Sequence, residues 1–182
     1  MKKLITIITI LALFLIISGN CFAQGKLTTV ILIRHAEKGT GDDPDLTDKG
    51  KKRGAALARL LERTPIAAVY STKYKRTTQT AADIAKSHDM EIINYNVMNP
   101  AQAAGFYNDI LDKYSGQNVL VVSHSNIIPI MLDKLKSEFF HTDVSNTSGD
   151  ILNDDMFVIT FDEKILKIVH LKYGEPASGT MH

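Results

Sequence analysis

The chain has 182 residues, of which 45% are hydrophobic and 23% are charged, and its formal net charge is +1. This length suits one globular domain with a sizeable core. The near-zero charge excludes a protein that binds nucleic acid through a strongly basic surface.

The first 23 residues are predicted to be an export signal. Lys2 and Lys3 precede an almost unbroken apolar stretch over residues 4–17, and Cys21-Phe22-Ala23 offers small residues for cleavage before Gln24. The apolar stretch has about 14 residues, fewer than the roughly 20 that span a bilayer. We therefore expect the signal to be removed, without stable membrane insertion of the mature chain.

Cys21 offers an alternative, a lipoprotein acylated at this residue. Asn20 fits such a site poorly because a small residue is needed there, so a periplasmic or secreted protein cleaved after Ala23 is favoured. The mature chain, residues 24–182, would then contain no cysteine and carry a formal charge of about −1. We expect one domain that depends on its core and not on disulfides.

Strand-like and helix-like segments alternate along residues 24–182. Strands are predicted at 28–33, 66–70, 91–95, 118–122, 156–161 and 165–171, and helices at 47–63, 76–87, 101–114 and from about 127 onward. This alternation predicts a three-layer α/β/α fold with a mainly parallel sheet, to which the last two strands add an antiparallel edge.

The helix at 47–63 is predicted to begin after a cap at Thr47. Its apolar stripe contains Leu57 and Leu61. Basic side chains, Arg53 and Arg59 among them, are expected to lie largely outside that stripe.

Three predicted strands end in polar residues. Arg34 and His35 follow the first strand, Ser71 ends the second with Arg76 close behind it, and His124 follows the strand at 118–122. The carboxyl ends of parallel strands meet at one edge of a sheet, where ligands collect in open α/β folds. We therefore expect two arginines and two histidines to converge.

Such a group of side chains favours an anion over a metal. Arginine repels a cation and cannot ligate it, whereas two guanidinium groups suit the oxygens of a phosphoryl group. The helix start beyond Ser125 is expected to add backbone N–H donors. We therefore predict a phosphoryl-binding site with no metal.

Four segments resemble the motifs of the histidine phosphatase superfamily, which shares its fold with the phosphoglycerate mutases. They occur in the family's order: Arg34-His35-Ala36-Glu37, Leu46-Thr47-x-x-Gly50, Ser71-Thr72-x-x-x-Arg76-Thr77-x-Gln79-Thr80-Ala81 and Val121-Val122-Ser123-His124-Ser125-Asn126. One such motif would be weak evidence, but four in order are specific.

The resemblance implies a phosphatase that acts on small phosphorylated compounds without a cofactor. His35 would be the nucleophile that forms a phosphohistidine, and Arg34 and Arg76 would bind the phosphoryl oxygens. His124 would hydrogen-bond the same oxygens, with Ser125 and Asn126 beside it in the substrate site.

The general acid does not follow the family pattern. Many members carry a glutamate after the third strand, but residues 96–106 contain no carboxylate, and Ser125 stands where another branch has an aspartate. Glu37 is the tentative acid because it is nearest in sequence to the nucleophile, with Asp42 and Asp43 behind it. Two alternatives to a phosphatase stay open: a phosphomutase of the same superfamily, and a non-catalytic anion-binding module.

Overall fold

The computed structural model describes residues 26–140, 150–162 and 164–177, so the predicted export signal lies outside the described residues. The elements in chain order are β1 (Thr28–Arg34), α2 (Asp48–Leu61), β2 (Ile66–Ser71), α3 (Lys75–Ser87), β3 (Ile92–Asn94), α4 (Pro100–Tyr114), β4 (Asn118–Ser123), α5 (Ile128–Phe140), β5 (Asp155–Phe161) and β6 (Leu166–Lys172). These bounds confirm the predicted elements to within a few residues.

The six strands form one sheet in the order β3-β2-β4-β1-β5-β6. The strands β3, β2, β4 and β1 are mutually parallel, and β5 and β6 complete the sheet as an antiparallel edge. The predicted fold class is confirmed.

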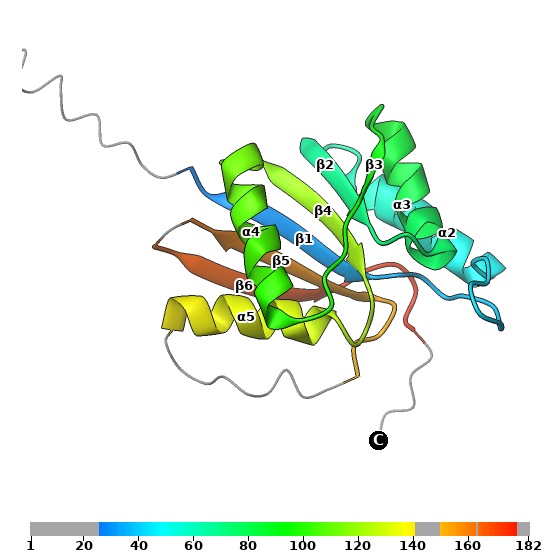
Figure 1. Ribbon diagram of the computed structural model, residues 1–182. Coiled ribbons are helices and arrows are strands. Elements are labelled where there is room, and N and C mark those ends of the chain that lie inside the picture. Colours follow the sequence, from blue (N-terminus) through cyan, green and yellow to red (C-terminus); the bar gives the residue numbers. More distant parts are fainter. Residues whose placement is uncertain (1–25, 141–149, 163, 178–182) are drawn as a thin grey trace, which may run out of the picture.

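Helices cover both faces of this sheet (Figure 1). Side chains that alternate along β1 separate two cores: Val30 and Leu32 face α4 and α5, whereas Ile31 and Ile33 face α2 and α3. This alternation is the two-residue period of a strand buried on both faces.

Capping residues mark the beginning of two of the helices. The side chain of Thr47 accepts a hydrogen bond from the amide of Gly50, which caps α2 as predicted. Asn99 caps α4 in the same way, and Pro100 occupies its first turn, where a missing N–H costs nothing.

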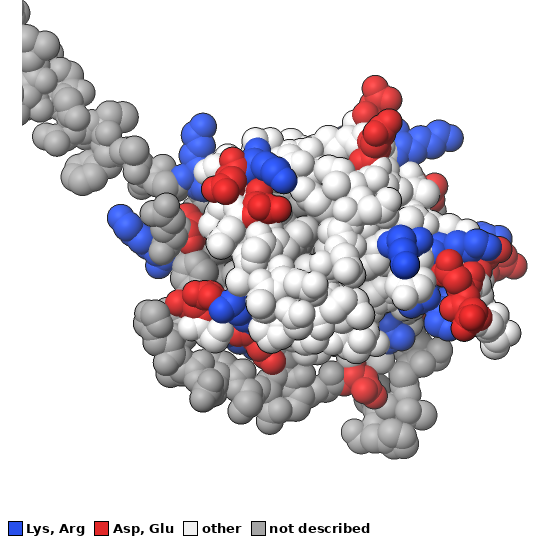
Figure 2. All heavy atoms as spheres, in the orientation of Figure 1, with Lys and Arg blue, Asp and Glu red and all other residues white. Residues whose placement is uncertain are grey.

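Charged side chains of both signs lie around the margin of the face that carries α4, and the centre of that face is largely uncharged (Figure 2). Within the described part of the chain, no helix combines the length and apolar character that a membrane span requires.

Candidate active site

The two motif histidines meet at the carboxyl edge of the parallel strands. The register pairs Arg34 at the end of β1 with Ser123 at the end of β4, so the residues that follow, His35 and His124, lie side by side. Their ring centroids are 5.5 Å apart, and the rings are inclined at 63°. Both residues are buried, with 5% and 9% of their surfaces exposed.

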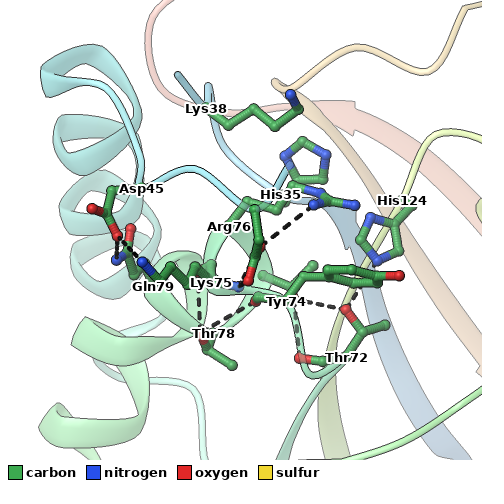
Figure 3. Close-up of polar contacts among 12 residues, drawn as sticks. His35, Lys38, Asp45, Thr72, Tyr74, Lys75, Arg76, Thr78, Gln79 and His124 are labelled. Atoms are coloured by element: carbon green, nitrogen blue, oxygen red, sulfur yellow. Dashed lines mark hydrogen bonds and ion pairs between the residues drawn. The ribbon is translucent and has the colours of Figure 1, made fainter. Parts of the chain in front are cut away.

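Figure 3 shows that His35 and His124 share their site with Arg76, whose guanidinium group extends toward both rings. The structure therefore brings together these three predicted residues from three different segments of the chain.

The imidazole of His35 is held by the main chain of the next residue. Its Nδ1 lies 2.8 Å from the main-chain oxygen of Ala36. A carbonyl oxygen only accepts hydrogen bonds, so Nδ1 must carry the proton and Nε2 keeps its lone pair. This is the tautomer that a nucleophilic histidine needs.

Both histidines are kept neutral. Burial, together with the positive charge of Arg34 and Arg76, lowers the pKa of His35 and of His124 from 6.5 to about 4. A neutral imidazole is nucleophilic and an imidazolium ion is not, so His35 is ready to react at neutral pH.

These lowered pKa values should make stability depend on pH. The unfolded chain binds the two protons below about pH 6.5 and the folded chain only near pH 4, so the histidines' contribution is complete above pH 6.5 and is lost as the pH falls toward 4. Each contributes a slope of up to about 1.4 kcal/mol per pH unit. Urea unfolding between pH 7 and 4 should therefore show a steeper loss for the unchanged protein than for a His35→Gln/His124→Gln double variant. Equal slopes would contradict the lowered pKa values.

Arg76 is positioned by groups on both sides of it. Its guanidinium lies 4.3 Å from the ring centre of Tyr74, and its Nη1 is 3.7 Å from Oδ1 of Asp43. The Asp43 carboxylate also accepts hydrogen bonds from the main-chain amide of Lys75, so it caps α3, whose N-cap residue Tyr74 makes no side-chain cap. Asp43 is thus engaged with the start of α3 and with Arg76, whereas Asp42 is exposed on the same loop.

Arg34 lies at the same edge of the sheet and forms a hydrogen bond to a distant part of the chain. Its Nη1 donates to the main-chain oxygen of Ile151 at 2.6 Å. Burial lowers the pKa of Arg34, and the carboxylates of Asp150 and Asp155 oppose this effect. Because the intrinsic pKa of a guanidinium is so high, Arg34 remains a cation beside the histidines.

His124 is oriented by a threonine that the sequence analysis did not single out. The hydroxyl of Thr72 lies 2.9 Å from Nε2 of His124 and 2.7 Å from the hydroxyl of Thr77. Tyr74 packs its ring edge against the same imidazole, with 5.4 Å between ring centroids. Thr72 and Thr77 both belong to the motif that contains Arg76. Their place in that motif could have indicated a role at the site.

A cavity of about 640 Å³ opens beside His124 and Arg76. Its lining residues come from the β2–α3 turn, from β3 and the segment after it, and from the β4–α5 turn: Thr72, Lys73, Tyr74, Arg76, Asn94, Tyr95, Asn96, Met98, His124, Asn126 and Ile127. The predicted site residue Asn126 is among them, and Ser125 is not. The lining contains cations and amides, and no carboxylate among the described residues.

The helix start beyond Ser125 was predicted to offer main-chain N–H groups to an anion, and this prediction is wrong for two amides. The N–H groups of Ile127 and Ile128 both donate to the main-chain oxygen of His124 at 3.0 Å. They close the turn that leads into α5, so they are not free to bind an anion.

Glu37 does not have the environment of a general acid. Its carboxylate accepts two hydrogen bonds from Arg53, Nε to Oε2 at 2.9 Å and Nη2 to Oε1 at 2.7 Å, and Lys49 lies 3.6 Å away. Although partial burial alone would raise the pKa of Glu37, the hydrogen bonds and charge of Arg53 bring it below its usual value. A general acid must hold a proton at working pH, so the structure argues against the prediction for Glu37 and assigns it to an ion pair.

The burial of Arg53 corrects a second expectation. Arg53 was expected outside the apolar stripe of its helix, but only 3% of its surface is exposed. It shares a helix face with Leu57 and Leu61 at four-residue spacing. That spacing indicates burial of Arg53. Besides Glu37, it donates to the main-chain oxygen of Tyr173 at 2.9 Å, so it ties the first motif to the segment after β6.

Comparison with known proteins agrees with this geometry. Residues 30–98 match the model of the histidine phosphatase superfamily (branch 1). Over these residues the chain is similar to the histidine phosphatase superfamily. The match contains Arg34, His35 and Arg76, and His124 lies beyond it.

One related protein is similar to part of this chain. Phosphoserine phosphatase 1 of Hydrogenobacter thermophilus is 37% identical over 75 residues, which cover 37% of this chain and 36% of the relative. The matched stretch thus spans about a third of that protein's length.

Several solved structures resemble this chain over most of its length. YhfR of Bacillus stearothermophilus aligns with a TM-score of 0.61 and 19% identity, covering 78% of this chain and 95% of that one. A phosphoglycerate mutase of Bacillus anthracis gives 0.63 and 16%, with 81% and 93% covered. The protein histidine phosphatase SixA, in complex with tungstate, gives 0.61 and 16%, with 79% and 96% covered. At these identities the likeness establishes the fold.

The glycine at position 50 has a steric reason in this chain. A Cβ atom on Gly50 would lie 2.1 Å from the main-chain oxygen of Glu37, which no side chain permits. The same oxygen accepts a hydrogen bond from the amide of Thr47 at 2.9 Å. Because residue 50 is glycine, the first turn of α2 can pack directly against the main chain of Glu37.

Proposed function

We propose that the protein is a phosphohydrolase that uses His35 as its nucleophile. The observation that carries this proposal is a buried, neutral pair of imidazoles 5.5 Å apart, with Nδ1 of His35 bonded to a carbonyl and with Arg76 at the same site. The match of residues 30–98 to the histidine phosphatase superfamily supports it.

The reaction has two balanced steps. In the first, the lone pair of His35 Nε2 forms a bond to phosphorus while the bond from phosphorus to the leaving oxygen breaks, and that oxygen takes up a proton from solvent. In the second, water attacks phosphorus, loses a proton to solvent and releases Nε2 with its lone pair. Arg34, Arg76 and His124 stabilise the charge on the phosphoryl oxygens in both steps.

The rest of the substrate would occupy the cavity beside His124. Its amides and cations can hydrogen-bond a polar leaving group, but no described lining residue is a carboxylate that could protonate the leaving oxygen. The ion-paired state of Glu37 removes the tentative acid as well. Substrates whose leaving groups depart without protonation are therefore favoured, such as aryl phosphates, acyl phosphates and phosphoramidates.

A leaving-group series tests this preference. A positioned general acid contributes about 10²–10⁴-fold, so kcat/KM should fall steeply from aryl to alkyl phosphates as the pKa of the leaving group rises. The matched control is Glu37→Gln, which should give the same slope if Glu37 serves only its ion pair. A flat series, or a slope that Glu37→Gln steepens, would restore an acid to the mechanism.

The same assay separates the two alternatives. A non-catalytic anion-binding module would bind inorganic phosphate but would not release nitrophenol from p-nitrophenyl phosphate. A phosphomutase would require a sugar diphosphate for turnover, whereas the proposed phosphohydrolase needs only water.

We also propose that the chain is exported through residues 1–23 and acts in the periplasm or outside the cell as residues 24–182. The charged start, the short apolar stretch and the absence of cysteine from residues 24–182 support this proposal. Mass spectrometry of the protein from fractionated cells should find Gln24 at the N-terminus. An intact N-terminus, or a lipid on Cys21, would contradict it.

A further inference from the structure

Each main-chain N–H and C=O group of His35 and Ala36 has a hydrogen-bond partner. The amide of His35 donates to the main-chain oxygen of Ser123 at 2.9 Å, and the amide of Ala36 donates to Oγ1 of Thr80 at 2.9 Å. The carbonyl of Ala36 receives Nδ1 of His35 at 2.8 Å. The carbonyl of His35 receives Nδ2 of Asn153 at 2.7 Å.

Asn153 differs from the other partners in its origin. Ser123 and Thr80 belong to the superfamily motifs around β4 and α3, whereas Asn153 lies in the segment before β5, 118 residues away from His35. The function proposed above gives Asn153 no role.

The segment that carries Asn153 contacts two residues of the first motif, Arg34 and His35. Ile151 accepts the hydrogen bond from Arg34, and Asn153 donates to His35. The segment is itself fixed by Asp155, whose side chain accepts from the amide of Leu152 at 2.5 Å.

Asp155 is in turn anchored to β6. It lies 2.6 Å from Nε2 of His170 and 2.5 Å from Nζ of Lys172, and only 3% of its side chain is exposed. The antiparallel strands β5 and β6 are thus connected to Arg34 and His35 through the hydrogen-bonded residues 151–153.

We propose that Asn153 is a positioning residue for the nucleophile. By holding the carbonyl of His35, while Thr80 holds the amide at the other end of the same peptide, Asn153 fixes the plane of that peptide. The plane sets the direction of the next carbonyl, that of Ala36, and this carbonyl keeps the proton of His35 on Nδ1. Asn153 therefore maintains the reactive tautomer through the main chain, and its catalytic consequence rests on the proposed function of His35.

Asn118 supplies a matched control. Its Nδ2 donates to the main-chain oxygen of Pro65 at 2.9 Å, a bond of the same kind at the opposite, amino-terminal end of β4. Both asparagines are half-buried. A purely structural contribution should be similar in the two variants, whereas an effect on His35 should appear only at Asn153.

The test compares Asn153→Ala and Asn153→Asp with Asn118→Ala in the full protein. Two quantities are measured: kcat and KM with p-nitrophenyl phosphate, and the ¹⁵N chemical shifts of the two ring nitrogens of His35. Asn153→Ala and Asn153→Asp should lower kcat by roughly 10- to 100-fold with little change in KM, because the reacting atom is misplaced and binding is not lost. Their ¹⁵N shifts should report a mixture of ring tautomers, and Asn118→Ala should keep the Nδ1–H tautomer and full turnover.

Unchanged kcat and tautomer in the Asn153 variants would overturn the proposal, and so would an equal loss of kcat in Asn118→Ala. Should Asn153→Ala fail to fold, Asn153→Ser provides a shorter donor and an intermediate effect is expected. If the unchanged protein hydrolyses no phosphate ester, the proposed function fails, but the ¹⁵N shifts still decide whether Asn153 sets the tautomer of His35.

Discussion

Replacement of His35 by alanine is expected to abolish hydrolysis of p-nitrophenyl phosphate. His35 Nε2 carries the lone pair that attacks phosphorus in the first step of the proposed mechanism, so no phosphohistidine can form without it. We expect kcat/KM to fall by at least about 10³-fold, as is usual when a covalent nucleophile is removed. Steady-state kinetics with the purified protein measure the loss.

The control for His35→Ala is His88→Ala. His88 lies at the end of α3 and bonds main-chain oxygens of Ile84 and Thr64, away from the sheet edge that carries the site. Its removal should leave turnover near that of the unchanged protein. Activity that survives in His35→Ala would assign the nucleophile to another group or to water.

Arg76→Lys is expected to have the second largest effect. Lysine keeps the positive charge but lacks the planar group that stacks on Tyr74 and donates in a fork to two phosphoryl oxygens. Loss of such an oxyanion donor costs about 10²–10³-fold in kcat, so we expect a decrease of this size in kcat/KM, with a smaller change in the free energy of unfolding.

Arg59→Lys is the matched control for Arg76→Lys. Arg59 is exposed on α2 and its side chain is not part of the site. Activity should therefore stay unchanged in this variant. If Arg76→Lys also retained full activity, phosphoryl binding by the Arg76 guanidinium would be contradicted.

The layered fold could be predicted from the sequence because its signals are local. Apolar runs such as Val119–Val122 have the length of strands buried on both faces, and Thr47 marks a helix start within a few residues of its partner Gly50. The site at the strand ends followed from topology, since parallel neighbours carry Arg34-His35 and His124 to one edge.

The roles of Glu37 and Asn153 could not be predicted in the same way. Each depends on a tertiary partner: Glu37 on Arg53, 16 residues away, and Asn153 on a carbonyl 118 residues away. A carboxylate beside a nucleophile in the sequence suggests an acid, and only its neighbours in space determine whether it holds a proton. Helical spacing would have placed Arg53 on the buried face, but no spacing links Asn153 to His35.

In the proposed mechanism, His35 becomes phosphorylated during turnover. The most direct measurement is peptide mass spectrometry of the protein after alkaline quenching during hydrolysis of p-nitrophenyl phosphate, with acid treatment of a parallel sample. We predict one phosphoryl group on the peptide that contains His35, stable in alkali and lost in acid, as a phosphorus–nitrogen bond requires. Turnover without that label, or a label on a different residue, would contradict it.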